Sequence, residues 1–148
     1  MRTTSDHASL AVRLEAPPPD VWQFFDWPNL AMLYPAGQLR RVEYLSTAAV
    51  VGAVRKLEFV DGGAICERLE IYEPDDFHLV YRVIDTGVAP LAEYLGDLRL
   101  TRAGARACSV RMACEFTPLG ASAGEFASFW QELNRATLAF IRSRVEAA

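Results

Sequence analysis

One acidic residue, Glu67, lies in a segment that otherwise has the pattern of a half-buried β-strand. Successive side chains of a strand point to opposite faces. In the run GAICERLEIYE (63–73), Glu67 then shares its face with three aliphatic residues, Ile65, Leu69 and Ile71. A carboxylate on an apolar face is costly unless its pKa rises or a cation or donor accompanies it. A raised pKa would suit Glu67 to proton transfer near neutral pH.

The residues expected to accompany Glu67 come from neighbouring strand segments. Arg55 alternates in phase with Leu57 and Phe59 and is the expected cation, while the hydroxyls of Tyr81 and Tyr94 are the expected donors. Three interpretations of Glu67 stay open. It forms a structural ion pair with Arg55, it contacts a ligand directly or through water, or it acts as a catalytic acid or base.

Composition limits the classes of function. The chain has 148 residues, 51% of them hydrophobic, which fits a single domain over 1–148. Its net charge of −4 is spread without a basic stripe, so no nucleic-acid partner is expected, and no apolar run is long enough for stable membrane insertion. The start lacks the apolar segment of a secretory signal, and the three cysteines lack metal spacing. A cytoplasmic location is therefore expected, with free thiols and neither a metal nor a cofactor.

Hydrophobic alternation and turn residues predict the order of the elements that hold these side chains. One strand is followed by two short helices at PPPDVWQFFDW (17–27) and PNLAMLYP (28–35), and six further strands then follow, joined largely by hairpins. The expected strands are 8–16, 39–45, 53–60, 63–73, 77–85, 90–101 and 107–117. An antiparallel sheet of this kind needs a cover on one face.

The last segment predicts a long amphipathic helix that would supply this cover. Ser122 and Glu125 have the spacing of a capping box. Apolar residues then recur at steps of three and four: Phe126, Phe129, Trp130, Leu133, Thr137, Phe140, Ile141 and Val145. A bent sheet around such a helix leaves a space that can hold a ligand.

Four segments carry a resemblance to a known family. They are APPPDVWQFFDWPNL, GAVRKLEFVDGG, CERLEIYEPDDFHLVYRVID and EYLGDLRLT. The chain, from about Leu10 to about Val145, resembles the START-like (SRPBCC) helix-grip superfamily, in particular its polyketide cyclase/dehydrase and lipid-transport branch. The layout is also similar to that of the birch pollen allergen and the plant abscisic-acid receptors. The resemblance implies an α+β fold in which a curved seven-stranded antiparallel sheet wraps around the long C-terminal helix, with two short helices after the first strand.

The receptor pattern transfers to this chain only in part. Its glutamate, cavity tyrosine and arginine match Glu67, Tyr94 and Arg55, and its helix phenylalanine and asparagine match Phe126 and Asn134. The lysine that meets the hormone's carboxylate instead falls on or near an alanine, Ala36. The gate loop is reduced to VDGGA and the latch is replaced by TGVAP, so the resemblance does not imply binding of an acidic hormone by that route.

The resemblance and the alternation together predict an apolar chamber with few polar groups. Its expected lining is Arg55, Leu57, Phe59, Ile65, Glu67, Leu69, Tyr81, Val83, Tyr94, Phe126, Trp130 and Asn134. For Asn134 a solvent-facing position is equally open, and Gly96 either leaves volume for a ligand or marks a bulge. The expected ligand is a hydrophobic or aromatic small molecule, polyketide- or lipid-like. The protein would be its carrier, or a polyketide cyclase/dehydratase that uses Glu67 as acid or base.

One alternative comes from a different class of function. The same fold could serve as a protein-interaction module with a vestigial cavity, in which Trp27, Leu33 and Tyr34 form a contact patch. Self-association into a homodimer is left open. Side chains that fill the chamber would favour this alternative over ligand binding.

Overall fold

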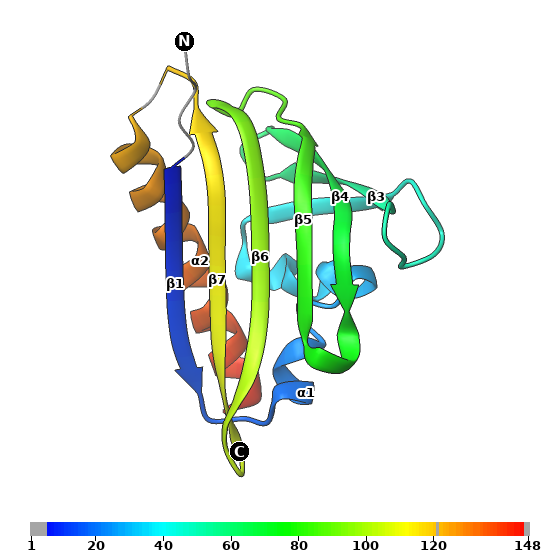
Figure 1. Ribbon diagram of the computed structural model, residues 1–148, viewed down its shortest axis with the longest axis vertical. Coiled ribbons are helices and arrows are strands. Elements are labelled where there is room, and N and C mark those ends of the chain that lie inside the picture. The colour runs from blue at the N-terminus through cyan, green and yellow to red at the C-terminus, as the bar shows by residue number, and fades with distance from the viewer. Residues whose placement is uncertain (1–5, 121, 147–148) are drawn as a thin grey trace.

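A single antiparallel sheet organises the molecule. The computed structural model describes residues 6–120 and 122–146. Its seven strands lie in the order β1-β7-β6-β5-β4-β3-β2 (Figure 1). Their bounds are β1 (Asp6–Leu14), β2 (Leu39–Tyr44), β3 (Val54–Phe59), β4 (Ala64–Glu73), β5 (His78–Asp85), β6 (Leu91–Gly104) and β7 (Ala107–Pro118). The predicted α+β helix-grip fold is confirmed.

The long helix α2 (Ala123–Val145) lies across one face of the sheet, behind β1 and β7 in Figure 1. It begins where predicted, because the Ser122 hydroxyl accepts a hydrogen bond from the Glu125 backbone N–H at 3.0 Å. Phe126, Trp130, Leu138 and Ile141 are its buried residues. Phe129, expected in the same buried stripe, is instead 60% exposed.

The predicted first short helix ends early. Helix α1 (Pro18–Trp22) starts at a proline, as expected. It does not reach Pro28. The Asp26 side chain accepts a hydrogen bond from the backbone N–H of Trp27. That bond starts the 3₁₀ helix η1 (Trp27–Ala36) in place of a second α-helix. A further 3₁₀ turn, η2 (Pro74–Asp76), joins β4 to β5.

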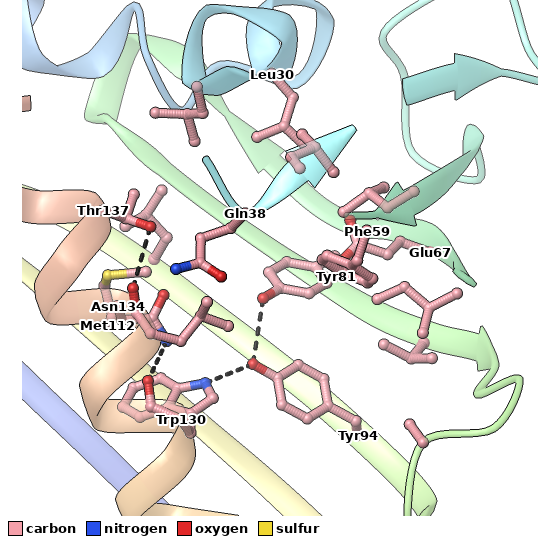
Figure 2. Close-up of a pocket in the computed structure, with 18 of the residues that line it drawn as sticks. Leu30, Gln38, Phe59, Glu67, Tyr81, Tyr94, Met112, Trp130, Asn134 and Thr137 are labelled. Atoms are coloured by element: carbon pink, nitrogen blue, oxygen red, sulfur yellow. Dashed lines mark hydrogen bonds between the residues drawn. The ribbon is translucent and has the colours of Figure 1, made fainter. Parts of the chain in front are cut away.

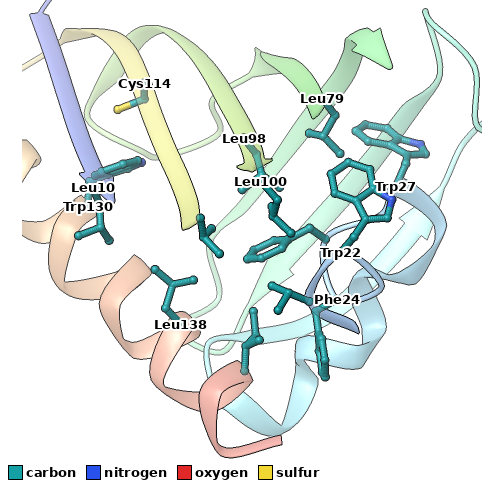
Figure 3. Packing of buried hydrophobic residues seen from close by; sticks show 14 of the residues in the cluster. Leu10, Trp22, Phe24, Trp27, Leu79, Leu98, Leu100, Cys114, Trp130 and Leu138 are labelled. Carbon is teal, nitrogen blue, oxygen red and sulfur yellow. The ribbon is translucent and has the colours of Figure 1, made fainter. Parts of the chain in front are cut away.

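The main core runs along the space between the sheet and α2, from Trp130 to Ile141 on the helix (Figure 3). Leu14, Val110 and Ile141 have no exposed surface there. Phe24, just after α1, packs edge-on against Phe140 of α2, with ring centroids 6.2 Å apart. No helix in the described part of the chain is long and apolar enough to cross a membrane.

The prediction of an exposed contact patch around Trp27 is wrong. Trp27 is only 1% exposed, because η1 turns its ring inward, beneath the Arg55 guanidinium. Leu33 is half-buried and packs against the core. Tyr34 stays partly exposed, and its hydroxyl accepts a hydrogen bond from the backbone N–H of Val42. These three residues therefore do not form one exposed surface.

Candidate functional site

One end of the space between sheet and helix is hollow. A cavity of about 270 Å³ lies between the inner face of β3–β6 and the part of α2 that runs to Thr137, with η1 closing one side (Figure 2). Small-molecule sites usually have volumes of about 300–1,000 Å³, so this cavity is close to the lower end of that range. The predicted residues that line it are Arg55, Leu57, Phe59, Ile65, Glu67, Tyr81, Val83, Tyr94, Phe126, Trp130 and Asn134.

Leu69 is the one predicted lining residue that does not reach the cavity. It is fully buried in the main core together with Ala53. Leu69 keeps the inward position that alternation predicts, but core side chains cover it; the β4–β5 register shifts only beyond it, and Ile71, expected on the same face, is 42% exposed. Simple parity counting cannot anticipate such a bulge.

Arg55 and Glu67 form a buried ion pair in the wall of the cavity. They are directly opposite each other on β3 and β4, and the Arg55 Nε atom donates to Glu67 Oε1 at 2.9 Å. Each residue is only 4% exposed. Arg55 Nη1 also donates to the Trp27 carbonyl oxygen at 2.9 Å, and its guanidinium lies 3.8 Å from the Trp27 ring centroid. The pair therefore ties two strands to η1.

Burial dominates the ionisation of Glu67. Loss of hydration raises the pKa of its carboxyl group, and the charge and hydrogen bond of Arg55 offset only part of that rise. The predicted Arg55 partner is confirmed. The prediction that Tyr81 and Tyr94 donate to Glu67 is wrong, because their hydroxyls form a hydrogen bond with each other and not with Glu67. Within the described residues, Glu67 accepts a side-chain hydrogen bond from Arg55 alone.

Three aromatic side chains form a second polar feature of the wall. The Trp130 indole Nε1 donates to the Tyr94 hydroxyl at 2.8 Å, and the Tyr94 and Tyr81 hydroxyl oxygens are 3.3 Å apart (Figure 2). Tyr81 stands directly opposite Gly96 in the β5–β6 pair. A Cβ atom at Gly96 would come within 2.4 Å of the Tyr81 ring, so this glycine makes room for the phenol and not for a ligand or a bulge.

Helix α2 contributes a mixed wall. Phe126 packs on Phe116 with ring centroids 4.5 Å apart. Asn134 lines the cavity, and its amide nitrogen donates to the Trp130 carbonyl oxygen at 2.9 Å. The Thr137 hydroxyl donates to the Leu133 carbonyl at 3.2 Å, one turn earlier. The helix side is therefore mostly apolar, and its polar groups are largely satisfied within the helix.

Further lining residues were not in the predicted set, and some of them come from η1, β2 and the β5–β6 loop. They include Phe25, Leu30, Leu33, Gln38, Leu39, Thr86, Ala89, Leu91 and Met112. The spacing of Leu30 and Leu33 is that of one helical face and could have pointed to them. For the loop at Thr86 and Ala89, the signal was the family resemblance, which placed TGVAP at the position of the receptor latch.

Metal and thiol chemistry find no support in the described residues. No group of histidine, cysteine and acidic side chains among residues 6–120 and 122–146 has the arrangement of a metal site. His78 bonds the carboxylates of Glu73 and Asp97 instead. The three cysteines are free, and burial raises the pKa of the Cys114 thiol to about 11, which suppresses the reactive thiolate.

Comparisons with known proteins agree with the fold. A family model described as polyketide cyclase / dehydrase and lipid transport matches residues 5–146. The Zhui aromatase/cyclase from Streptomyces sp. R1128 is 17% identical with a TM-score of 0.78, over 97% of this chain and 94% of that one. Norcoclaurine synthase from Thalictrum flavum is 18% identical with a TM-score of 0.72, over 99% and 89%. An uncharacterised Bacillus thuringiensis protein is 19% identical with a TM-score of 0.78, over 95% and 98%. No curated protein matches the sequence.

Proposed function

The chain belongs to the polyketide cyclase / dehydrase and lipid transport family, and from that premise we propose that it binds a hydrophobic or aromatic small molecule, polyketide- or lipid-like, in its cavity. One observation carries this proposal: the hollow beside α2 is lined by aliphatic and aromatic side chains with few polar groups among them. Sites of that composition exclude water and hold apolar ligands by burial of surface.

A pair of helix variants tests ligand binding. Leu133 lines the cavity, whereas Ala136, three residues on, is exposed. Native mass spectrometry of the purified protein should reveal a co-purified small molecule. We expect Leu133→Trp to lose that molecule because the indole occupies the cavity, and Ala136→Trp, which adds the same ring on the exposed side, to retain it. Equal retention by both variants would contradict binding in this cavity.

A second candidate function is catalysis of polyketide cyclisation, favoured by the raised pKa of Glu67. In an aldol step, the Glu67 carboxylate would take a proton from the carbon between two carbonyl groups. That carbon would then form a C–C bond to the carbon of a third carbonyl group further along the same chain. The protonated Glu67 would return the proton to the alkoxide oxygen that this bond creates. A cavity that holds the chain folded supplies part of the rate effect through positioning.

The Glu67→Gln variant separates the carrier from the enzyme. A linear polyketone thioester serves as probe, with binding measured by calorimetry and cyclised product by mass spectrometry. For an enzyme, we expect product formation to fall by about two orders of magnitude or more with binding retained. For a carrier, the wild-type protein forms no more product than buffer alone, and the substitution changes affinity only modestly.

The cellular setting and the assembly state belong to the same proposal. The free cysteines, two of them buried, support a reducing compartment such as the cytoplasm. The interaction-module alternative loses its central residue, since Trp27 is buried. Size-exclusion chromatography with light scattering would decide between a monomer and a homodimer.

A further inference from the structure

We propose that Trp130, Tyr94 and Tyr81 form a one-way hydrogen-bond relay that leaves the Tyr81 hydroxyl as a donor to the ligand. The cavity then selects ligands that carry an oxygen acceptor, such as a ketone carbonyl, on an otherwise hydrocarbon framework. This inference rests on the proposed binding function and adds the chemical class of the ligand. It concerns the wall formed by β5, β6 and α2, apart from the Arg55–Glu67 pair (Figure 2).

The direction of the relay starts at the indole. An indole nitrogen can only donate a hydrogen bond, so the 2.8 Å contact occupies a lone pair of the Tyr94 oxygen. The Tyr94 hydrogen must then point elsewhere, and the Tyr81 oxygen, 3.3 Å away, is in place to accept it. The Tyr94 hydroxyl also lies against the Cys114 sulfur, but a thiol is the weaker acceptor.

Tyr81 stands at the open end of the relay. Once its oxygen accepts from Tyr94, its own hydrogen is available, and the described residues offer its hydroxyl no other hydrogen-bond partner than Tyr94. Burial and the nearby Glu67 charge raise the pKa of Tyr81, so the hydroxyl stays protonated and able to donate. The ring has little freedom to turn away, because it occupies the space left by Gly96.

The surroundings decide which oxygen would accept this hydrogen bond. A ligand carboxylate would have to compete for Arg55, which is already paired with Glu67 and bonded to the Trp27 carbonyl. A neutral carbonyl needs no counter-charge and gains one hydrogen bond from a donor that is otherwise unpaired. The remaining lining combines apolar side chains such as Val83 and Leu98 with the uncharged amides of Gln38 and Asn134, and it adds no further cation for an acid. A ketone on a ring system therefore fits this wall better than an acid.

Two probes of nearly identical shape test the relay. 9-Fluorenone and fluorene are flat tricyclic molecules that differ in a carbonyl group against a methylene group. We expect the wild-type protein to bind fluorenone about tenfold more tightly, the effect of one net hydrogen bond in a buried site. The infrared carbonyl stretch of bound fluorenone should lie below its frequency in hydrocarbon solvent, which reports the hydrogen bond directly.

Substitutions then test which residue donates the hydrogen bond to the ligand and which residue sets the direction of the relay. Tyr81→Phe removes only the hydroxyl, and the affinity ratio of the two probes should fall to about one. Trp130→Phe frees the Tyr94 lone pair, so the Tyr81 hydrogen can turn back toward Tyr94, and the ratio should fall by roughly threefold. In the Tyr81→Phe background, Trp130→Phe should leave the ratio at about one. A change of packing alone would weaken both probes together and leave the ratio unchanged.

The outcomes separate this inference from the function on which it rests. If wild-type protein binds neither probe, ligand binding in this cavity fails and the relay fails with it. If both probes bind equally tightly, or the carbonyl stretch equals its value in hydrocarbon, the relay is wrong while the binding function stands. If Trp130→Phe does not fold, the Tyr81→Phe ratio and the infrared band still decide the role of Tyr81.

Discussion

The two ends of the space between the sheet and α2 differ in what fills them. At the end of α2 near Ile141, side chains after α1 such as Phe24 pack into the layer and leave no room. At the end near Trp130, the corresponding cover is η1, whose Leu30 and Leu33 line the wall and belong to a small cluster with Leu39 and Leu57. Because the same sheet and the same helix bound both ends, the hollow follows from the short covering segments and not from the layers themselves.

The two ends of α2 have different roles: the filled end stabilises the fold, and the hollow end offers a surface to a ligand. Packed aliphatic side chains at the filled end bury surface and stabilise the fold. At the hollow end, some side chains face the cavity and not other side chains, so they can contact a ligand. The hollow end keeps a small buried apolar cluster of Leu30, Leu39 and Leu57, and it also holds the buried ion pair of Arg55 with Glu67.

The largest expected effect would come from the ion pair at the hollow end. Arg55→Met leaves the buried Glu67 carboxylate unpaired and removes the contacts with Trp27. We expect the free energy of unfolding to fall by about 3–5 kcal/mol in urea titrations. Adding Glu67→Gln should recover most of the loss, since no unpaired charge then remains. A loss below about 1 kcal/mol in the single variant would mean that water in the cavity already solvates Glu67.

A matched pair of truncations tests the comparison itself. Ile141→Ala at the filled end should lower the free energy of unfolding by about 2–5 kcal/mol, because a close-packed site cannot collapse around the lost atoms. Leu133→Ala, on the same helix beside the cavity, should lower it by less than about 1 kcal/mol. Similar losses for the two variants would show that the hollow end packs as tightly as the other.

The smallest effect concerns pH. Burial raises the folded-state pKa of Glu67 above the ordinary value of 4.5. Below about 4.5 the carboxyl is protonated in both the folded and the unfolded chain. As the pH rises toward the folded pKa, the unfolded chain loses its proton first, and the wild type loses stability relative to Glu67→Gln. Urea titrations of both proteins across this range check the sign, and a difference that is constant or of opposite sign would show that Arg55 outweighs burial.

Much of the fold could be predicted because it depends on local periodicity. Alternation marks the strands, and the three-and-four stripe together with Ser122 marks α2. The same parity predicted that Arg55 and Glu67 share a face on adjacent strands, and the structure sets them directly opposite each other. These features depend on hydrophobic pattern and capping, which act within a few residues along the chain.

The rest of the site depends on features that parity does not describe. Leu69 points inward but is covered by the main core, a bulge beyond it leaves Ile71 exposed, and Trp27 at the start of η1 is buried. The tyrosine hydroxyls bond each other because Trp130 reaches them from α2, a contact between residues distant in sequence. The rim of the cavity at Thr86 likewise depends on the path of a loop in space.

Gly96 has a consequence for how this chain can diverge. The phenol ring of Tyr81, on the neighbouring strand, occupies the space that a side chain at position 96 would fill. A relative that gained alanine at position 96 would have to push that ring toward the hollow, which would both shrink the binding volume and misdirect the hydroxyl. We therefore expect the two positions to be inherited together, so that sequences keeping the glycine also keep the tyrosine, and those losing one have changed the other.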